Sequence, residues 1–211
     1  MASVEFYFDY SCPWSYLACL RLIETATRTG STIEWRPIVL DTLLARVHPD
    51  RPFDREPVDP RKSAYEARDI EAWADYVGVE INRPADWPAS GALAARGAVV
   101  AARQERIRAY SAAVFSAYFG PGADIADILV LSALAEQAGL ERQSFEQALI
   151  DSSVVEGVDA NIKTLLSRGG FGAPTMFVGD DMFFGSDRMP LVEFALGQSS
   201  GREFVMPGQH G

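Results

Sequence analysis

The chain opens with alternating apolar and polar positions, which predict a β-strand over residues 4–8. Apolar residues then recur at helical spacing from residue 13 to about residue 29, where Gly30 supplies a common helix C-terminal signal. A second apolar stretch over residues 31–40 predicts another strand. Because a helix joining two strands makes a crossover connection, we expect these two strands to be parallel.

The middle of the chain shows helical periodicity without further strand signals. A polar connection rich in proline covers residues 41–60, and an alanine-rich stretch over residues 91–119 predicts one long helix. The other helices expected in this part cover residues 61–77, 125–138, 141–150 and 153–167, and a proline-containing loop covers residues 82–90.

Strand signals return near the C-terminus. Short strands are expected at residues 175–178 and 182–184, with a hairpin turn between them. A last helix then runs to about residue 196, and Ser186 or Asp187 is a suitable N-cap for it.

This order of elements predicts an α/β core interrupted by a helical insertion. We assign the discontinuous core to residues 1–45 and 165–200, the helical insertion to residues 46–164, and a C-terminal tail to residues 201–211.

Cys12 is the first candidate for chemistry, because it lies between the first predicted strand and the first predicted helix. Pro13 follows it, and proline is favoured at a helix start, where its missing N–H would have no partner anyway. The helix N-terminus stabilises an anion, so we expect a thiol here to be more acidic than a free cysteine. Cys19 falls within the apolar helix and is expected to be buried and inert.

Charge and composition exclude several classes of function. The formal net charge is −10 and no basic block is present, which argues against nucleic acid binding. No apolar run is long enough for a membrane helix, and no leader precedes the first strand, so we expect a cytoplasmic protein without a membrane partner. Two cysteines and two histidines provide neither a disulfide framework nor a metal cluster.

Several short motifs occur together in one order along the chain. They are Phe-Asp-Tyr-Ser-Cys-Pro-Trp-Ser-Tyr-Leu at 8–17, Trp-Arg-Pro at 35–37, the trio Lys62, Tyr65 and Asp69, Trp-Pro-Ala-Ser at 87–90, Gly-Ala-Pro-Thr at 172–175, and Phe-Gly-Ser-Asp-Arg at 184–188. In this order, and over nearly the whole chain, the sequence resembles the 2-hydroxychromene-2-carboxylate isomerases and the related kappa-class glutathione transferases. The resemblance implies a thioredoxin-like fold of the DsbA/kappa type with a large all-helical insertion.

The resemblance also implies a homodimer that binds glutathione in a groove roofed by the insertion. The residues it assigns to glutathione are Cys12, Pro13, Trp14, Lys62, Ala173, Pro174, Ser186 and Asp187. Among these, a cis Ala173–Pro174 bond would present the Ala173 backbone to the cysteinyl unit, and Ser186 and Asp187 would receive the γ-glutamyl end. Cys12 or Ser15 would donate to the glutathione sulfur, and Trp14, Trp87 and Ser90 would line a pocket for a flat substrate.

Two departures from the family pattern keep alternatives open. The isomerases mostly carry serine where this chain has Cys12, and disulfide oxidoreductases carry a second cysteine where it has Ser15. Many isomerases also carry asparagine at the position of Ser90. We therefore expect a glutathione-dependent isomerase acting on a conjugated, aromatic-type carbonyl compound. The alternatives are a kappa-class-like glutathione transferase or monothiol disulfide oxidoreductase acting through Cys12, and a non-catalytic thioredoxin-like binding module.

Overall fold

The computed structural model describes residues 2–50, 59–84 and 87–199. The whole of the expected tail over residues 201–211 and the centre of the proline-rich connection lie outside these ranges. Within them, a mixed sheet has the strand order β2-β1-β3-β4. Its strands are β1 (Ser3–Phe8), β2 (Thr32–Pro37), β3 (Thr175–Val178) and β4 (Asp181–Phe184).

The two strand pairings that the sequence predicts are both present. β1 and β2 are parallel, with Phe6 opposite Trp35, as the crossover through the first helix requires. β3 runs antiparallel to β1 and forms the expected hairpin with β4. The thioredoxin-like α/β fold is therefore confirmed, and β1 occupies the interior of the sheet.

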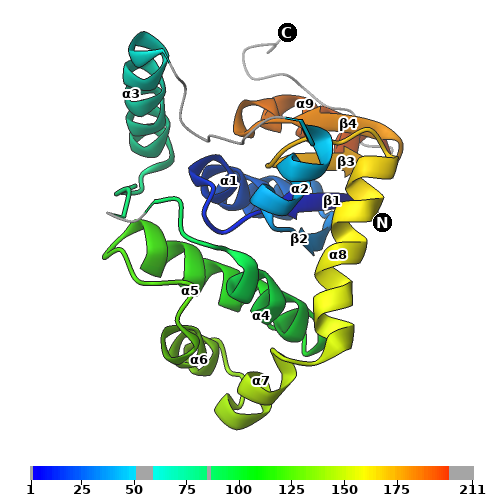
Figure 1. Cartoon of the computed structure of the whole chain (residues 1–211). Coiled ribbons are helices and arrows are strands. Elements are labelled where there is room, and N and C mark those ends of the chain that lie inside the picture. The colour runs from blue at the N-terminus through cyan, green and yellow to red at the C-terminus, as the bar shows by residue number, and fades with distance from the viewer. Residues whose placement is uncertain (1, 51–58, 85–86, 200–211) are drawn as a thin grey trace, which may run out of the picture.

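Helices surround this sheet and account for the regular structure between β2 and β3 in the described part of the chain. They are α1 (Pro13–Thr29), α2 (Leu40–Val47), α3 (Pro60–Val77), α4 (Ala92–Arg103), α5 (Ile107–Phe119), α6 (Ile128–Gln137), α7 (Arg142–Ala148), α8 (Ser152–Ser167) and α9 (Met189–Ser199), with a 3₁₀ turn η1 (Ser186–Arg188) before α9. In Figure 1, α4 to α7 gather on one side of the sheet and α3 stands apart from them, in contact with α1. None of the described helices combines the length and apolarity that crossing a bilayer requires.

The alternation along β1 divides the core into two parts. Phe6 and Phe8 join the larger cluster, which includes Leu22 of α1, Phe115 of α5 and Leu196 of α9. The opposite face of β1 contributes to a second cluster, which contains Tyr7, Cys12, Ile38, Ile162 and Leu165. Burial of these apolar side chains on both faces is the main force that holds the helices to the sheet.

The prediction of a strand over residues 31–40 and a connection from residue 41 was partly wrong. β2 ends at Pro37, and residues 40–47 form the helix α2. The N-cap residue of α2, Val39, has no side-chain cap, but the Asp9 carboxylate accepts the amide of Leu40 at 2.8 Å. A residue distant in sequence therefore supplies the start signal of α2, and no local pattern could show it.

The prediction of one helix over residues 91–119 was also wrong. α4 ends at Arg103 and α5 begins at Ile107, and Glu105 between them has a φ of 59°. The amide of Arg106 donates to the carbonyl of Ala101 at 2.8 Å, which closes the turn and lets α4 and α5 pack together. Near the C-terminus, Ser186 and Asp187 were expected to be N-cap candidates, but both lie inside η1. The N-cap residue of η1 is Gly185.

Candidate functional site

The turn between β1 and α1 is organised by the buried carboxylate of Asp9. One of its oxygens accepts the amide of Ser11 at 2.7 Å and the hydroxyl of Ser11 at 2.5 Å, while the other accepts the amide of Leu40. The Cys12 amide donates to the Asp9 carbonyl at 3.2 Å. Asp9 is fully buried, and its charge is offset by these donors. The residues that precede α1 are therefore held to α2 as well as to the end of β1.

Cys12 is the N-cap residue of α1, as its place before Pro13 predicts. Its thiol is buried and lies 3.6 Å from the carbonyl oxygen of Ala173, to which it donates. The Ala173–Pro174 bond is cis, as the resemblance implies. Cys12 thus lies beside the expected Ala173–Pro174 pair, although 161 positions separate Cys12 from Ala173 in the sequence.

Two cavities adjoin this point. The larger cavity has a volume of about 540 Å³ and is lined by Trp14, Tyr65, Asp69, Trp73, Ala173, Pro174, Phe184, Gly185, Ser186 and Asp187. The smaller cavity has a volume of about 140 Å³ and is lined by Ser11, Cys12, Pro13, Trp14, Leu40, Glu66, Trp87 and Ala173. Because Trp14 and Ala173 line both, the two cavities meet beside the Cys12 thiol.

Part of the larger cavity is formed by η1 and the glycine before it. Ser186 is almost fully buried, whereas about half of the Asp187 side chain is exposed and lies 3.5 Å from Arg188. Gly185, which precedes them, has a φ of 107°, and a Cβ atom there would lie 2.6 Å from an Asp187 carboxylate oxygen. Glycine is therefore required for this turn to present the Asp187 carboxylate.

The smaller cavity has a fixed aromatic wall. The indole N–H of Trp87 donates to the carbonyl of Ser11 at 3.0 Å, so the ring is tied to the turn before Cys12. The guanidinium of Arg83 lies 4.5 Å from the centre of the Trp87 ring and 3.7 Å from the Glu66 carboxylate. These contacts hold the indole in one orientation, which suits stacking against a flat molecule.

Three of the expected site residues line neither cavity. Lys62 and Ser90 are exposed. Ser15 is fully buried, and its hydroxyl accepts the amide of Asp9 at 3.3 Å. The structure thus places Ser15 in the support of the turn, and the ligand contacts expected of these three residues stay predictions.

Cys19 is buried inside the core cluster, as expected. Burial raises the pKa of its thiol to about 12, although Arg108 acts in the opposite direction. Among the described residues, no group of three or more histidine, cysteine, aspartate or glutamate side chains is placed to hold a metal ion.

The sequence did not assign a role to several residues that line the cavities. Tyr65, Asp69 and Trp73 come from α3, and Glu66 of the same helix lines the smaller cavity. Trp73 falls within the helix that the sequence predicts over residues 61–77, with no further role indicated. The available signal was the occurrence of three aromatic residues, Tyr65, Trp73 and Tyr76, in a predicted helix that is otherwise strongly charged.

Comparisons with known proteins identify the family and the fold of this chain. The DSBA-like thioredoxin domain family matches residues 3–197. The 2-hydroxychromene-2-carboxylate isomerase of Sphingobium xenophagum is 35% identical over 196 residues, which cover 90% of this chain and 96% of that protein. Human glutathione S-transferase kappa 1 is 25% identical, with 93% and 91% covered.

A solved structure of a 2-hydroxychromene-2-carboxylate isomerase superposes with a TM-score of 0.82 at 30% identity, and 93% of this chain and 95% of that chain are covered. The agreement extends from β1 through the helical segment to α9, since the family match spans all of these elements. The chain therefore belongs to the DsbA-like thioredoxin family, in the group that contains the 2-hydroxychromene-2-carboxylate isomerases.

Proposed function

We propose that the protein is a glutathione-dependent isomerase whose substrate is a conjugated, aromatic-type carbonyl compound. Its relatives named as isomerases support an isomerase function. The observation that carries the proposal is the junction of the two cavities at Cys12, Trp14 and Ala173. A cofactor in the larger cavity and a substrate in the smaller one would meet at this junction.

The larger cavity has the size and the chemistry that a tripeptide thiol needs. Its volume lies within the range of small-molecule sites, roughly 300–1,000 Å³. Ser186 offers a hydroxyl, and the Asp187 carboxylate matches the ammonium of a γ-glutamyl group. Ala173 and Pro174 also line this cavity, and the Ala173 carbonyl oxygen lies 3.6 Å from the Cys12 sulfur. We place the γ-glutamyl end at η1 and the cysteinyl unit at Ala173.

Glutathione, when bound, supplies a thiol nucleophile that can add reversibly to a conjugated double bond and so permit rotation about it. The chain contributes position and environment. Cys12 holds a sulfur-bound proton at the start of α1, where the helix dipole favours negative charge on a neighbouring atom. Trp14 and Trp87 would form aromatic walls for a flat substrate, and Leu40 adds an apolar side chain to the lining.

The test has two measurements on the purified protein. Calorimetry is expected to show binding of glutathione. Cis–trans isomerisation of a conjugated carbonyl compound, followed by absorbance, is expected to require glutathione and to stop when S-methylglutathione replaces it, because the thiol is then blocked. Isomerisation at the same rate without any thiol would overturn the proposal.

A second candidate function is supported by the chemical identity of residue 12. Cys12 lines the smaller cavity and is itself a thiol at a helix N-cap, so it could attack the disulfide of a substrate directly. The attack would form a mixed disulfide with Cys12 and release one thiol, and a second thiol would then break the mixed disulfide and restore Cys12, so that the protein would act as a monothiol oxidoreductase. The alternative of a glutathione transferase acting through Cys12 stays a prediction. Both candidates use a small-molecule substrate. The cytoplasmic location and the homodimeric state stay predictions.

A further inference from the structure

Arg21 of α1 contacts η1, the 3₁₀ turn that contributes Ser186 and Asp187 to the lining of the larger cavity. Its Nη1 atom donates to the carbonyl oxygen of Ser186 at 2.7 Å. Arg21 is half-buried and Ser186 is almost fully buried, so solvent competes weakly for this hydrogen bond. The contact joins residues that are 165 positions apart.

The same guanidinium also contacts α3. Its central carbon lies 4.9 Å from the centre of the Trp73 ring and 5.8 Å from that of the Tyr76 ring, within the range of cation–π attraction. Trp73 of α3 and Ser186 of η1 both line the larger cavity, and α1 itself contributes Trp14. Arg21 is therefore linked to each of the three elements that build this cavity around η1.

Charge adds a second reason to single out Arg21. The side chains that line the larger cavity include the carboxylates of Asp69 and Asp187, and no basic side chain is among the lining residues in the described part of the chain. Burial lowers the pKa of Arg21, while the nearby Asp187 carboxylate raises it, and arginine remains protonated in proteins. Arg188 pairs with Asp187 from the exposed side. Arg21 thus places a positive charge next to the Ser186 turn, outside the cavity lining. This charge offsets the repulsion that the carboxylates of Asp69 and Asp187 would exert on an anionic ligand.

We propose that Arg21 is a positioning residue for the γ-glutamyl carboxylate of a thiol ligand. It holds the Ser186 turn against α1 and α3 and offsets the charge of Asp187. The inference depends on the proposed glutathione site, but it assigns a role to a residue that does not line the cavity.

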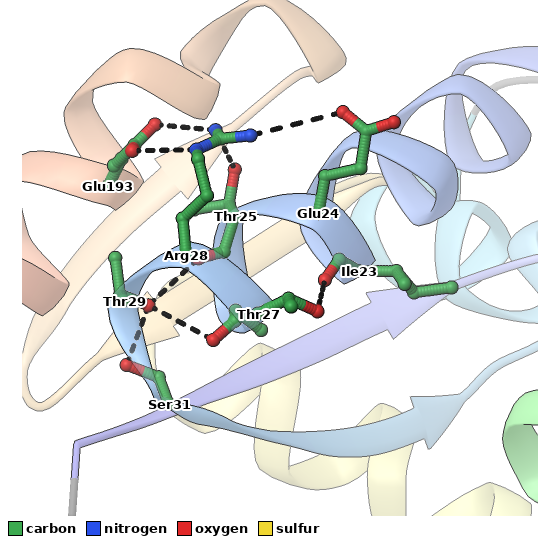
Figure 2. Close-up of polar contacts among 9 residues, drawn as sticks. Ile23, Glu24, Thr25, Thr27, Arg28, Thr29, Ser31 and Glu193 are labelled. Carbon is green, nitrogen blue, oxygen red and sulfur yellow. Dashed lines mark hydrogen bonds and ion pairs between the residues drawn. The ribbon is translucent and has the colours of Figure 1, made fainter.

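The test compares Arg21→Met with a matched variant on the same helix. Arg28 also reaches from α1 to the C-terminal part of the chain, where its guanidinium donates to Glu193 of α9 at 3.1 and 2.8 Å (Figure 2). It is exposed and lies outside the lining of the cavity. Arg28→Met therefore removes an arginine link of the same kind without changing the Ser186 turn.

Dissociation constants are measured by NMR titration, which also detects millimolar binding. One ligand is glutathione, and the other is 4-aminobutyryl-cysteinylglycine, which lacks only the γ-glutamyl α-carboxylate. Arg21→Met is expected to weaken glutathione binding about tenfold, equivalent to about 1.4 kcal/mol. It is expected to change binding of the second ligand less than twofold, and Arg28→Met is expected to leave both unchanged.

The outcomes separate the two proposals. Failure of the wild-type protein to bind glutathione would contradict the proposed function. If the wild type binds, then unchanged affinity in Arg21→Met, or an equal loss for both ligands, would overturn the role of Arg21, because a general structural effect does not depend on the α-carboxylate. Should Arg21→Met fail to fold, Arg21→Gln, which keeps an N–H donor, carries the same comparison.

Discussion

The Cys12 thiol donates to the carbonyl oxygen of Ala173 across 3.6 Å. Ala173 lines both cavities, so this contact places the sulfur at their boundary. A group at this boundary lies next to the bond that would form between a cofactor in one cavity and a substrate in the other. The two candidate functions differ in whether the sulfur of Cys12 reacts or only donates a hydrogen bond.

Cys12→Ser is predicted to keep isomerase activity and to abolish disulfide reduction. A serine hydroxyl donates at least as well as a thiol, so a hydrogen-bonding role survives the change. It forms almost no anion at neutral pH, so a nucleophilic role does not survive. The measurements are glutathione-dependent isomerisation of a conjugated carbonyl compound and reduction of a mixed disulfide. Cys19→Ala serves as the control, since it removes the thiol that lies inside the core.

Loss of isomerisation in a folded Cys12→Ser protein that still binds glutathione would contradict the first function. It would favour direct attack by Cys12 instead. Activity of the variant in both assays would show that residue 12 is not the nucleophile in either.

Asp187→Ala is predicted to weaken glutathione binding by roughly 10- to 150-fold. The substitution removes one partner of a charge-assisted hydrogen bond, which contributes about 1.5–3 kcal/mol. Calorimetry of the folded variant measures the effect. Asp180→Ala is a matched control, because Asp180 is an exposed aspartate in the β3–β4 turn outside both cavities. Equal affinity of the Asp187 variant and the wild type would place the γ-glutamyl end elsewhere.

Asp9→Asn is predicted to lower the free energy of unfolding by about 1–3 kcal/mol. The Asp9 carboxylate accepts from two amides and one hydroxyl, and an asparagine NH₂ group would face at least one of these donors. Urea denaturation measures the change. Ser11→Ala removes only the hydroxyl donor, so a smaller loss is expected from it. A fully stable Asp9→Asn protein would show that the turn does not depend on the charge of Asp9.

The pH dependence of stability is predicted to include a contribution from Cys19. Burial raises the pKa of its thiol from 9.0 to about 12, so the folded state holds a proton that the unfolded state releases. This contribution is complete below the unfolded pKa and is lost as the pH rises toward the folded value. The free energy of unfolding should therefore fall above about pH 9, by up to about 1.4 kcal/mol per pH unit.

Cys19→Ala should show a shallower slope between about pH 9 and pH 10. Tyr7, whose pKa burial raises from 10.0 to about 12, adds its own loss mainly above this interval. Denaturation at a series of pH values compares the slopes, which are independent of any packing loss common to all pH values. Parallel curves for the two proteins would contradict the assignment to Cys19.

Local patterns in the sequence determined the framework of this protein. Alternation predicted β1, helical spacing predicted α1, and Gly30 ends α1 with a φ of 65°. The place of Cys12 at the helix start followed from Pro13. These features depend on residues within one or two turns of each other, so that the sequence alone was sufficient to predict them.

Long-range contacts decided the rest. α2 begins where it does because Asp9 accepts the Leu40 amide, and the helix expected over residues 91–119 is divided because α4 and α5 pack against each other. Trp73 reaches the larger cavity only because α3 packs on α1, near Arg21. The contacts of Asp9 with Leu40 and of Arg21 with Trp73 join residues that are distant in sequence, whereas α4 and α5 are consecutive helices that pack together only after the chain turns back at Glu105. The free energy of all these contacts comes from burial and hydrogen bonding that exist only once the helices and the sheet have assembled.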